Sequence, residues 1–205
     1  MAHKMFRAAT AAMKRGSPVV LADDMSAQPT MGVLAVAAQH ADTHLTALLV
    51  RETSGFICVA MTADRLDRLQ VPQQTPGRRG PITGFAVAVD LRCGLTTGIS
   101  ARDRAMTIRA LADPMTQPDD LTRPGHVVPV CTAEAGVLEE PGVAEAAVDL
   151  CVAAGLHPAA AFATVLDSRG EVAGLAQLAV LAQHYTLPLL RVSDVAAWCN
   201  ARRAA

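Results

Sequence analysis

The stretch TTGISARDRAMTIRALADP, which runs from Thr96 to Pro114, holds the clearest local signals in this chain of 205 residues. Ser100 can accept a hydrogen bond from the first turn of a helix, and we expect that helix to span 101–112. Asp103 stands three residues after Ser100, where its carboxylate can bind back to the Ser100 backbone as in a capping box. The stretch therefore predicts one well-defined, capped helix.

Outward from this helix, the hydrophobic pattern alternates between helical and extended segments. We predict strands at 19–22, 33–37, 56–61, 85–90, 127–132, 159–166 and 187–192. We predict helices at 4–14, 42–52, 63–69, 101–112, 144–154 and 174–185, and a last helix capped by Ser193. Loops are expected at 25–32, 72–82 and 118–124. The alternation, with no evident linker or repeat, predicts one α/β domain in which helices cover a buried sheet.

The composition excludes several classes of protein. Apolar residues make up 51% of the chain, charged residues 18% and aromatic residues 3%. The mean hydropathy of +0.28 argues against intrinsic disorder. Eighteen basic and nineteen acidic residues give a net charge of −1, which argues against binding to a phosphate backbone. The few aromatic residues argue against base stacking, so we expect no nucleic-acid partner.

The five cysteines, an odd number without a CxxC pair, argue against a disulfide framework and a Cys-rich zinc site. They fit a reducing cytoplasm. The first 16 residues contain no continuous apolar run typical of a signal peptide. No run of about 18 apolar residues predicts a membrane span. We therefore expect a cytoplasmic protein that does not enter a membrane.

Several segments together resemble 3,4-dihydroxy-2-butanone 4-phosphate synthase, which converts ribulose 5-phosphate to a four-carbon phosphate plus formate in the riboflavin pathway. They are Thr96–Pro114, RPGHVVPV at Arg123–Val130, and AGVLEEPGVAEAAVDLCVAAG at Ala135–Gly155. The resemblance covers nearly the whole chain. It implies a three-layer α/β sandwich, one domain over residues 1–205, and a homodimer with active sites near the interface. It also implies a small-molecule substrate and magnesium as cofactor.

The chain departs from this family where the family binds magnesium. The family's acidic loop begins here with Asp23 and Asp24, but the position of its metal-binding glutamate holds Gln28. The histidine of the family motif G-H-T-E falls on Val143. Because magnesium prefers several hard oxygen ligands, these substitutions predict that the magnesium site is lost and that no cofactor is bound.

Further departures concern the phosphate and the catalytic glutamate. The family's phosphate-binding arginine and threonine fall on Glu140 and Ala144, and a further catalytic glutamate falls on Thr164. We therefore expect a repurposed, metal-independent enzyme of specialised metabolism rather than an authentic synthase. It would act as a lyase, isomerase, dehydratase or cyclase on a small, unphosphorylated molecule. The alternative is a non-catalytic homologue that binds a small ligand or regulates a true synthase.

Four residues are candidates for catalysis. His126, in the retained RPGHV segment, is the best candidate for a general acid or base, because a histidine titrates near neutral pH. A structural histidine at a dimer interface is the alternative. Asp23 and Asp24 follow a strand at an edge where ligands bind in many α/β sheets, or they are solvated turn residues. Cys58 is either a nucleophile with a neighbouring base, such as His126 or Arg104, or a buried, packed thiol.

Five further residues are candidates for substrate binding: Arg104, Arg123, Thr97, Thr164 and Glu145. Thr97 and Arg104 belong to a segment that capping and dimer packing could equally explain. Glu145 could instead satisfy backbone donors at a helix start. Arg78 and Arg79 are either solvated or form a lid that clamps an anionic ligand.

Overall fold

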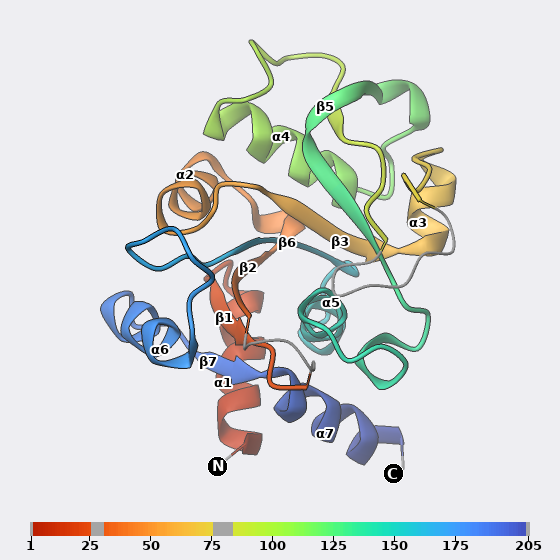
Figure 1. Ribbon diagram of the computed structural model, residues 1–205. Helices are drawn as coiled ribbons and strands as arrows, with labels where there is room; N and C mark the ends of the chain where they lie inside the picture. The colour runs from red at the N-terminus through yellow and green to blue at the C-terminus, as the bar shows by residue number, and fades with distance from the viewer. Residues whose placement is uncertain (1, 26–30, 76–83, 204–205) are drawn as a thin grey trace.

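The computed structural model of the chain describes residues 2–25, 31–75 and 84–203. Within these ranges a seven-stranded mixed sheet has the order β4-β5-β3-β6-β2-β1-β7 (Figure 1). Strands β3 and β5 are parallel, as are β1 and β7, and the other neighbours are antiparallel. The strands are β1 Val19–Ala22, β2 Gly32–Ala37, β3 Cys58–Thr62, β4 Val89–Leu91, β5 Leu121–Thr132, β6 Ala159–Thr164 and β7 Leu189–Arg191.

Helices cover both faces of this sheet. The α-helices are α1 Ala2–Lys14, α2 Thr43–Glu52, α3 Ala63–Arg68, α4 Ala101–Ala112, α5 Val143–Ala153, α6 Leu175–His184 and α7 Val192–Arg203. The part of the chain that the structure describes also contains the 3-10 helices η1 Ala38–His40, η2 Pro118–Asp120 and η3 Gly136–Leu138. In the described ranges no helix has the length and apolar character needed to cross a membrane.

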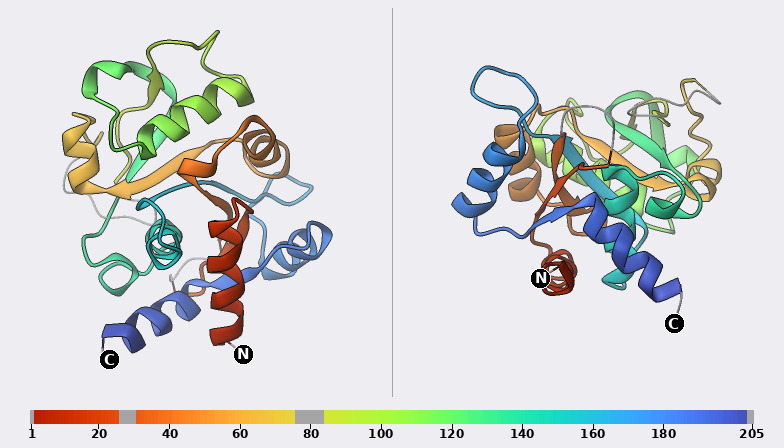
Figure 2. Two further views of the ribbon diagram at one scale, coloured as in Figure 1. Left: turned by 180° about the vertical axis from the view of Figure 1, so that it is seen from behind. Right: turned by 60° about the horizontal axis from the view of Figure 1, so that its bottom comes forward.

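Two apolar cores account for the three layers. Helices α1, α5 and α7 bury Met13, Leu150 and Val195 against one face of the sheet. Helices α2, α3, α4 and α6 bury residues such as Leu49 and Ile108 against the other face. Figure 2 shows α1 and α7 on one side of the sheet, where the Phe6 and Trp198 rings stack at 4.3 Å. The predicted three-layer α/β sandwich is confirmed.

The two strands β4 and β5 differ most from the prediction. The strand expected at 85–90 is only Val89–Leu91, while Phe85 and Ala86 form isolated bridges. The loop expected at 118–124 contains η2 and the start of β5, which already pairs with β4 from Leu121 onward. Pro124 is tolerated there because this part of β5 pairs with the short, irregular β4 rather than inside a regular ladder. The predicted start of β5 is therefore too late, because the prolines between 118 and 124 indicate a loop.

Two cap predictions are also wrong in part. Ser100 caps α4 as expected, accepting the Asp103 N–H at 3.0 Å. The Asp103 carboxylate does not complete a capping box, since it binds the preceding loop at Thr96 and Gly98. Ser193 does not cap α7, because the helix already begins at Val192 and Ser193 donates to Asp24.

Candidate functional site

The sheet brings four predicted catalytic or binding residues to one edge. Asp23 directly follows β1, Cys58 begins β3, and Thr164 ends β6. The register pairs Cys58 with Val128 on β5, so His126 lies two residues beyond that pair at the same edge. These four residues therefore lie along the same end of the sheet, but β3, β6 and β2 separate β1, which precedes Asp23, from β5, which carries His126.

His126 is held by a partner that sequence reasoning missed. The Asp90 carboxylate on β4 accepts the backbone N–H of His126 at 3.0 Å through Oδ1. Its Oδ2 lies 2.6 Å from Nδ1 of the His126 ring. Asp90 is buried, while the His126 side chain is 39% exposed. The ring is therefore fixed on its Nδ1 side and accessible elsewhere, as a general acid or base must be. An aspartate at the end of the alternating run Phe85–Asp90 was the only signal for this partner.

A second buried carboxylate shapes the loop before α4. Asp103 accepts the backbone N–H and the hydroxyl of Thr96 at 3.1 and 2.6 Å, and the Gly98 N–H at 3.1 Å. The Thr96 hydroxyl bond, more than any other contact, lowers the pKa of Asp103 below its usual range. Thr97, the threonine predicted to bind substrate, is exposed in the same loop. Asp103 thus stabilises the loop by binding the residues on either side of the exposed Thr97.

The two predicted arginines both bind backbone carbonyls. Arg104 is buried on α4 and donates through Nη1 to the Gly55 carbonyl at 3.0 Å, just before β3. Arg123 donates through Nη2 to the Leu69 carbonyl at 2.7 Å. Arg104 therefore ties α4 to the segment before β3, and Arg123 ties β5 to the end of α3. Their predicted contact with substrate stays a prediction.

Cys58 is buried on β3, and burial raises the pKa of its thiol to about 12. Such a thiol is protonated at neutral pH, whereas a nucleophile requires the thiolate. This environment matches the interpretation of Cys58 as a small packed side chain.

Asp23 and Asp24 have different surroundings. Asp23 is buried and accepts the Met25 N–H at 3.0 Å. Asp24 is exposed, and its two oxygens accept the N–H and hydroxyl of Ser193 at 3.0 and 2.6 Å. Asp24 therefore joins β1 to α7, which supports a structural role for it.

Glu145 and Thr164 interact with backbone groups. Glu145 is buried at the start of α5 and accepts the Ala133 N–H at 3.3 Å, beyond the other end of β5. Burial raises the pKa of Glu145 to about 7. Thr164 is partly buried, and its carbonyl accepts the Ser54 N–H at 2.8 Å. The structure thus places Glu145 away from the edge that carries His126.

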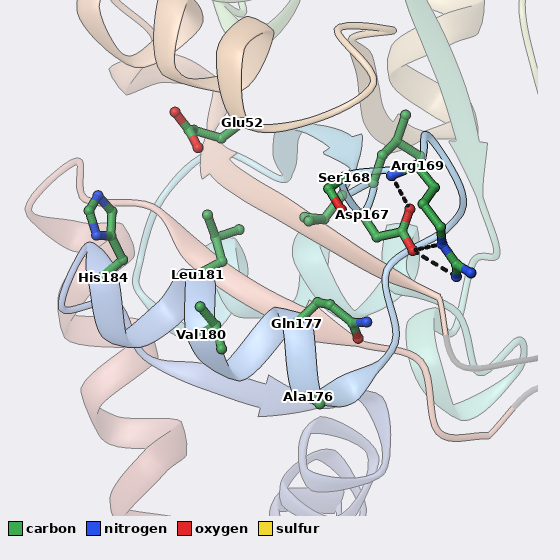
Figure 3. A pocket seen from close by; sticks show the side chains of 11 residues that line it. Glu52, Asp167, Ser168, Arg169, Ala176, Gln177, Val180, Leu181 and His184 are labelled. Atoms are coloured by element: carbon green, nitrogen blue, oxygen red, sulfur yellow. Dashed lines mark hydrogen bonds and ion pairs between the residues drawn. The ribbon is translucent and has the colours of Figure 1, made fainter.

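A cavity of about 710 Å³ opens on another part of the surface (Figure 3). It lies between the end of α2, the loop after β6 and the outer face of α6, with Glu52, Gln177 and His184 around it. None of the nine predicted site residues lines it. We assign no ligand to this cavity.

The described residues do not by themselves form a magnesium site. Within 2–25, 31–75 and 84–203, no three His, Cys, Asp or Glu residues are grouped so that they could hold a metal ion. Gln28 of the family's acidic loop lies outside the described residues, as do Arg78 and Arg79. Val143 is buried at the first position of α5.

Comparisons with known proteins agree on one family. A model of 3,4-dihydroxy-2-butanone 4-phosphate synthase matches residues 7–198. The riboflavin biosynthesis protein RibBA of Salinispora arenicola is 44% identical over 193 residues, which cover 93% of this chain and 45% of the relative. RibBA of Nocardia farcinica is 43% identical, with 93% and 46% covered. The chain spans about half the length of these curated relatives.

Two solved structures give the same result over nearly their whole length. A 3,4-dihydroxy-2-butanone 4-phosphate synthase in complex with two magnesium ions matches with a TM-score of 0.87 and 33% identity. The match covers 92% of this chain and 93% of that chain. A cation-free form of such a synthase matches with a TM-score of 0.87 and 32% identity, covering 94% and 95%.

These relatives overturn the expectation that magnesium is not a cofactor. The similar synthase contains two magnesium ions, so metal dependence is the property of the family. The substitutions at Gln28 and Val143 do not exclude magnesium, because this ion commonly keeps several water ligands and uses only one or two carboxylates together with substrate phosphate. The absence of two ligand side chains is therefore not enough to predict that the metal is lost.

The expectation of a repurposed, metal-independent enzyme of specialised metabolism is wrong as well. Relatives 40–44% identical over more than nine-tenths of the chain are riboflavin biosynthesis proteins. The alternative of a non-catalytic homologue falls with it, because the family is one of enzymes.

The match over residues 7–198, the shared three-layer fold and the identity to its relatives lead to one conclusion: this chain belongs to the 3,4-dihydroxy-2-butanone 4-phosphate synthase family.

Proposed function

We propose that this chain is a 3,4-dihydroxy-2-butanone 4-phosphate synthase that acts in riboflavin biosynthesis. It converts ribulose 5-phosphate into a four-carbon phosphate and formate. The observation that carries the proposal is the 44% identity to a riboflavin biosynthesis protein over 93% of the chain. All five carbons of the substrate are present in the two products, and the conversion needs no external oxidant or reductant.

The edge that holds His126 supports this reaction. Carbon–carbon rearrangement of a ketose phosphate begins with removal of a proton next to the carbonyl, which requires a base near neutral pH. His126 is a partly exposed imidazole with a fixed orientation. We assign the proton transfer to its Nε2. Asp23, buried at the same edge, is the second candidate for moving protons.

Magnesium belongs to the proposal because a similar synthase was solved with two magnesium ions. When bound, the ion would polarise substrate oxygens and so stabilise negative charge. The described residues do not complete a shell for it, so we assign no ligand and derive no step through it.

A homodimer and a cytoplasmic location are parts of the same proposal. Phe56, which is 55% exposed, and Ile99, which is 52% exposed, precede β3 and α4 and leave apolar surface near Gly55 and Thr97. A second copy would cover such surface. Light scattering at micromolar concentration should give twice the mass of 21.4 kDa, and a monomer would contradict the dimer. The five cysteines, all free, suit a reducing compartment.

Genetic complementation tests the proposed function. A bacterium that lacks its own synthase and requires riboflavin should grow without riboflavin when it expresses this chain. The H126A variant is the matched control and should not restore growth, although it should accumulate to the same level. Failure of the folded wild-type chain to restore growth would contradict the proposal.

A further inference from the structure

Arg104, on α4, is a buried cation with few partners. It is 7% exposed, and it donates through Nη1 to the Gly55 carbonyl at 3.0 Å. Its Nε is buried and has no hydrogen-bond partner among the described residues. Burial lowers the pKa of Arg104 below its usual value, but a guanidinium still keeps its charge at neutral pH. A buried charge without a counter-charge costs stability, so a purely structural role does not account for this residue.

The described residues provide no carboxylate for this guanidinium. None of the ion pairs that they form includes Arg104. The neighbouring Asp103 directs its carboxylate to the loop before α4 instead. The internal segments 26–30 and 76–83 lie outside the described residues, and their sequences contain no Asp or Glu. These observations point to a counter-charge on a molecule that this chain binds.

The guanidinium lies close to His126. Gly55, whose carbonyl Arg104 binds, is the residue before Phe56. The parallel register of β3 and β5, counted back by two residues from its first pair, brings Phe56 level with His126. The loop before α4 borders the same space, since a Cβ atom on Gly98 would lie 2.6 Å from His126 Nδ1. The positive charge of Arg104 is therefore placed beside the imidazole to which we assign the proton transfer.

We propose that Arg104 binds the phosphate group of the substrate, and that this phosphate is the missing counter-charge. A sugar phosphate carries a charge of about −1.5 to −2 at neutral pH, and a guanidinium forms charge-assisted hydrogen bonds with its oxygens. Nη2 neither donates to a described residue nor belongs to the buried atoms without a partner, so a phosphate oxygen can bind it at the surface. The inference rests on the proposed function for the identity of the anion, but not for the anion site itself.

The R104M variant tests the proposal, because methionine keeps a long apolar side chain and removes the charge. The KM for ribulose 5-phosphate should rise about 10- to 100-fold, whereas kcat should change little, since binding common to the ground state and the transition state is lost. R109M is the matched control. Arg109 also lies on α4 and donates to a backbone carbonyl, that of Ala41, but it is exposed. R109M should keep the wild-type KM.

Thermal unfolding with inorganic phosphate tests the anion site without turnover. Phosphate at about ten times its dissociation constant should raise the wild-type melting temperature by about 4 °C, at constant ionic strength and without added magnesium. R109M should respond equally, and R104M by less than about 1 °C. If R104M does not fold, R104Q replaces it, because the glutamine amide can still donate to the Gly55 carbonyl.

The outcomes separate this inference from the proposed function. A wild-type protein that phosphate does not stabilise overturns the inference, whatever the variants do, and so does a folded R104M with the wild-type KM. An R104M protein that becomes monomeric in light scattering but keeps the full phosphate response overturns it too, because the counter-charge would then be a carboxylate of a second copy. Stabilisation by phosphate that depends on Arg104, in a wild type that releases no formate, supports the anion site and contradicts the proposed function instead.

Discussion

Two buried carboxylates on opposite faces of the sheet show how differently this fold treats a negative charge. Asp103, on α4, is fully buried and accepts three hydrogen bonds from Thr96 and Gly98. Those bonds lower its pKa. Glu145, on α5, is 6% exposed and accepts the Ala133 N–H at 3.3 Å, and burial raises its pKa to about 7.

At Asp103 the hydrogen-bond donors outweigh burial and lower the pKa, whereas at Glu145 burial outweighs the donors and raises it. Burial alone disfavours the charged form, but hydrogen bonds to that form can reverse the effect. Around α4, backbone N–H groups donate hydrogen bonds to the carboxylates of Asp90 and Asp103. Such bonds favour the charged form of a carboxylate. The start of α5 is built mainly for apolar packing.

Removal of the Asp103 carboxylate should have the largest effect. D103A leaves three donors of Thr96 and Gly98 without their acceptor, and bonds to charged groups are the stronger ones. We expect the melting temperature to fall by about 5–10 °C in calorimetry. D103N, which retains an oxygen, should lose less. Equal melting temperatures for D103A and the wild type would show that the loop before α4 does not depend on Asp103.

The substitution E145Q should have the opposite sign and a smaller size. The folded-state pKa of about 7 exceeds the ordinary value of about 4.5, so the folded protein binds more protons than the unfolded chain between these pH values. Stability is then lost as pH rises from about 4.5 to about 7. E145Q stays neutral, so at pH 8 its free energy of unfolding should exceed that of the wild type by about 3 kcal/mol.

A measurement at low pH serves as the control for this prediction. Below about pH 4.5 the wild-type carboxyl is neutral in both states, so the advantage of E145Q should shrink toward zero there. Urea unfolding at pH 4 and pH 8 measures both values. An advantage that is the same at both pH values would contradict a burial-raised pKa.

The exposed Asp24 should have the smallest effect, although both of its oxygens are engaged by Ser193. Water can replace such bonds on the surface, so D24N should lower the free energy of unfolding by only about 0.5 kcal/mol. S193A is the matched variant on the other side of the contact. A loss as large as that of D103A would mean that exposure does not weaken these bonds.

The sequence was sufficient for the elements that depend on local signals. The helix after Ser100 has the predicted bounds, and the strand Val19–Ala22 follows from four consecutive apolar residues. The short β4 and the early start of β5 could not be predicted, because pairing across the register shift at Val89 overrides the prolines. The pairing of β4 with β5 therefore explains both the short β4 and the early start of β5.

The site was predictable only in part, for the same reason. The retained RPGHV segment indicates His126, but its partner Asp90 lies 36 residues earlier and pairs with it only through the sheet. The sequence left Cys58 open as a nucleophile or a buried, packed thiol, and the structure buries it. The substitutions at Gln28 and Val143 suggested a lost metal, because a sequence shows missing ligands but not the water and substrate that also bind magnesium.

The most direct test of the account is the fate of ribulose 5-phosphate with the purified chain and magnesium, followed by carbon-13 NMR. The account predicts formate and a four-carbon phosphate in equal amounts, at a rate of about one per second or faster. Omission of the chain should leave the substrate intact, and chelation of the metal should slow the reaction. Ribulose 5-phosphate that persists beside folded chain and excess magnesium would contradict the account.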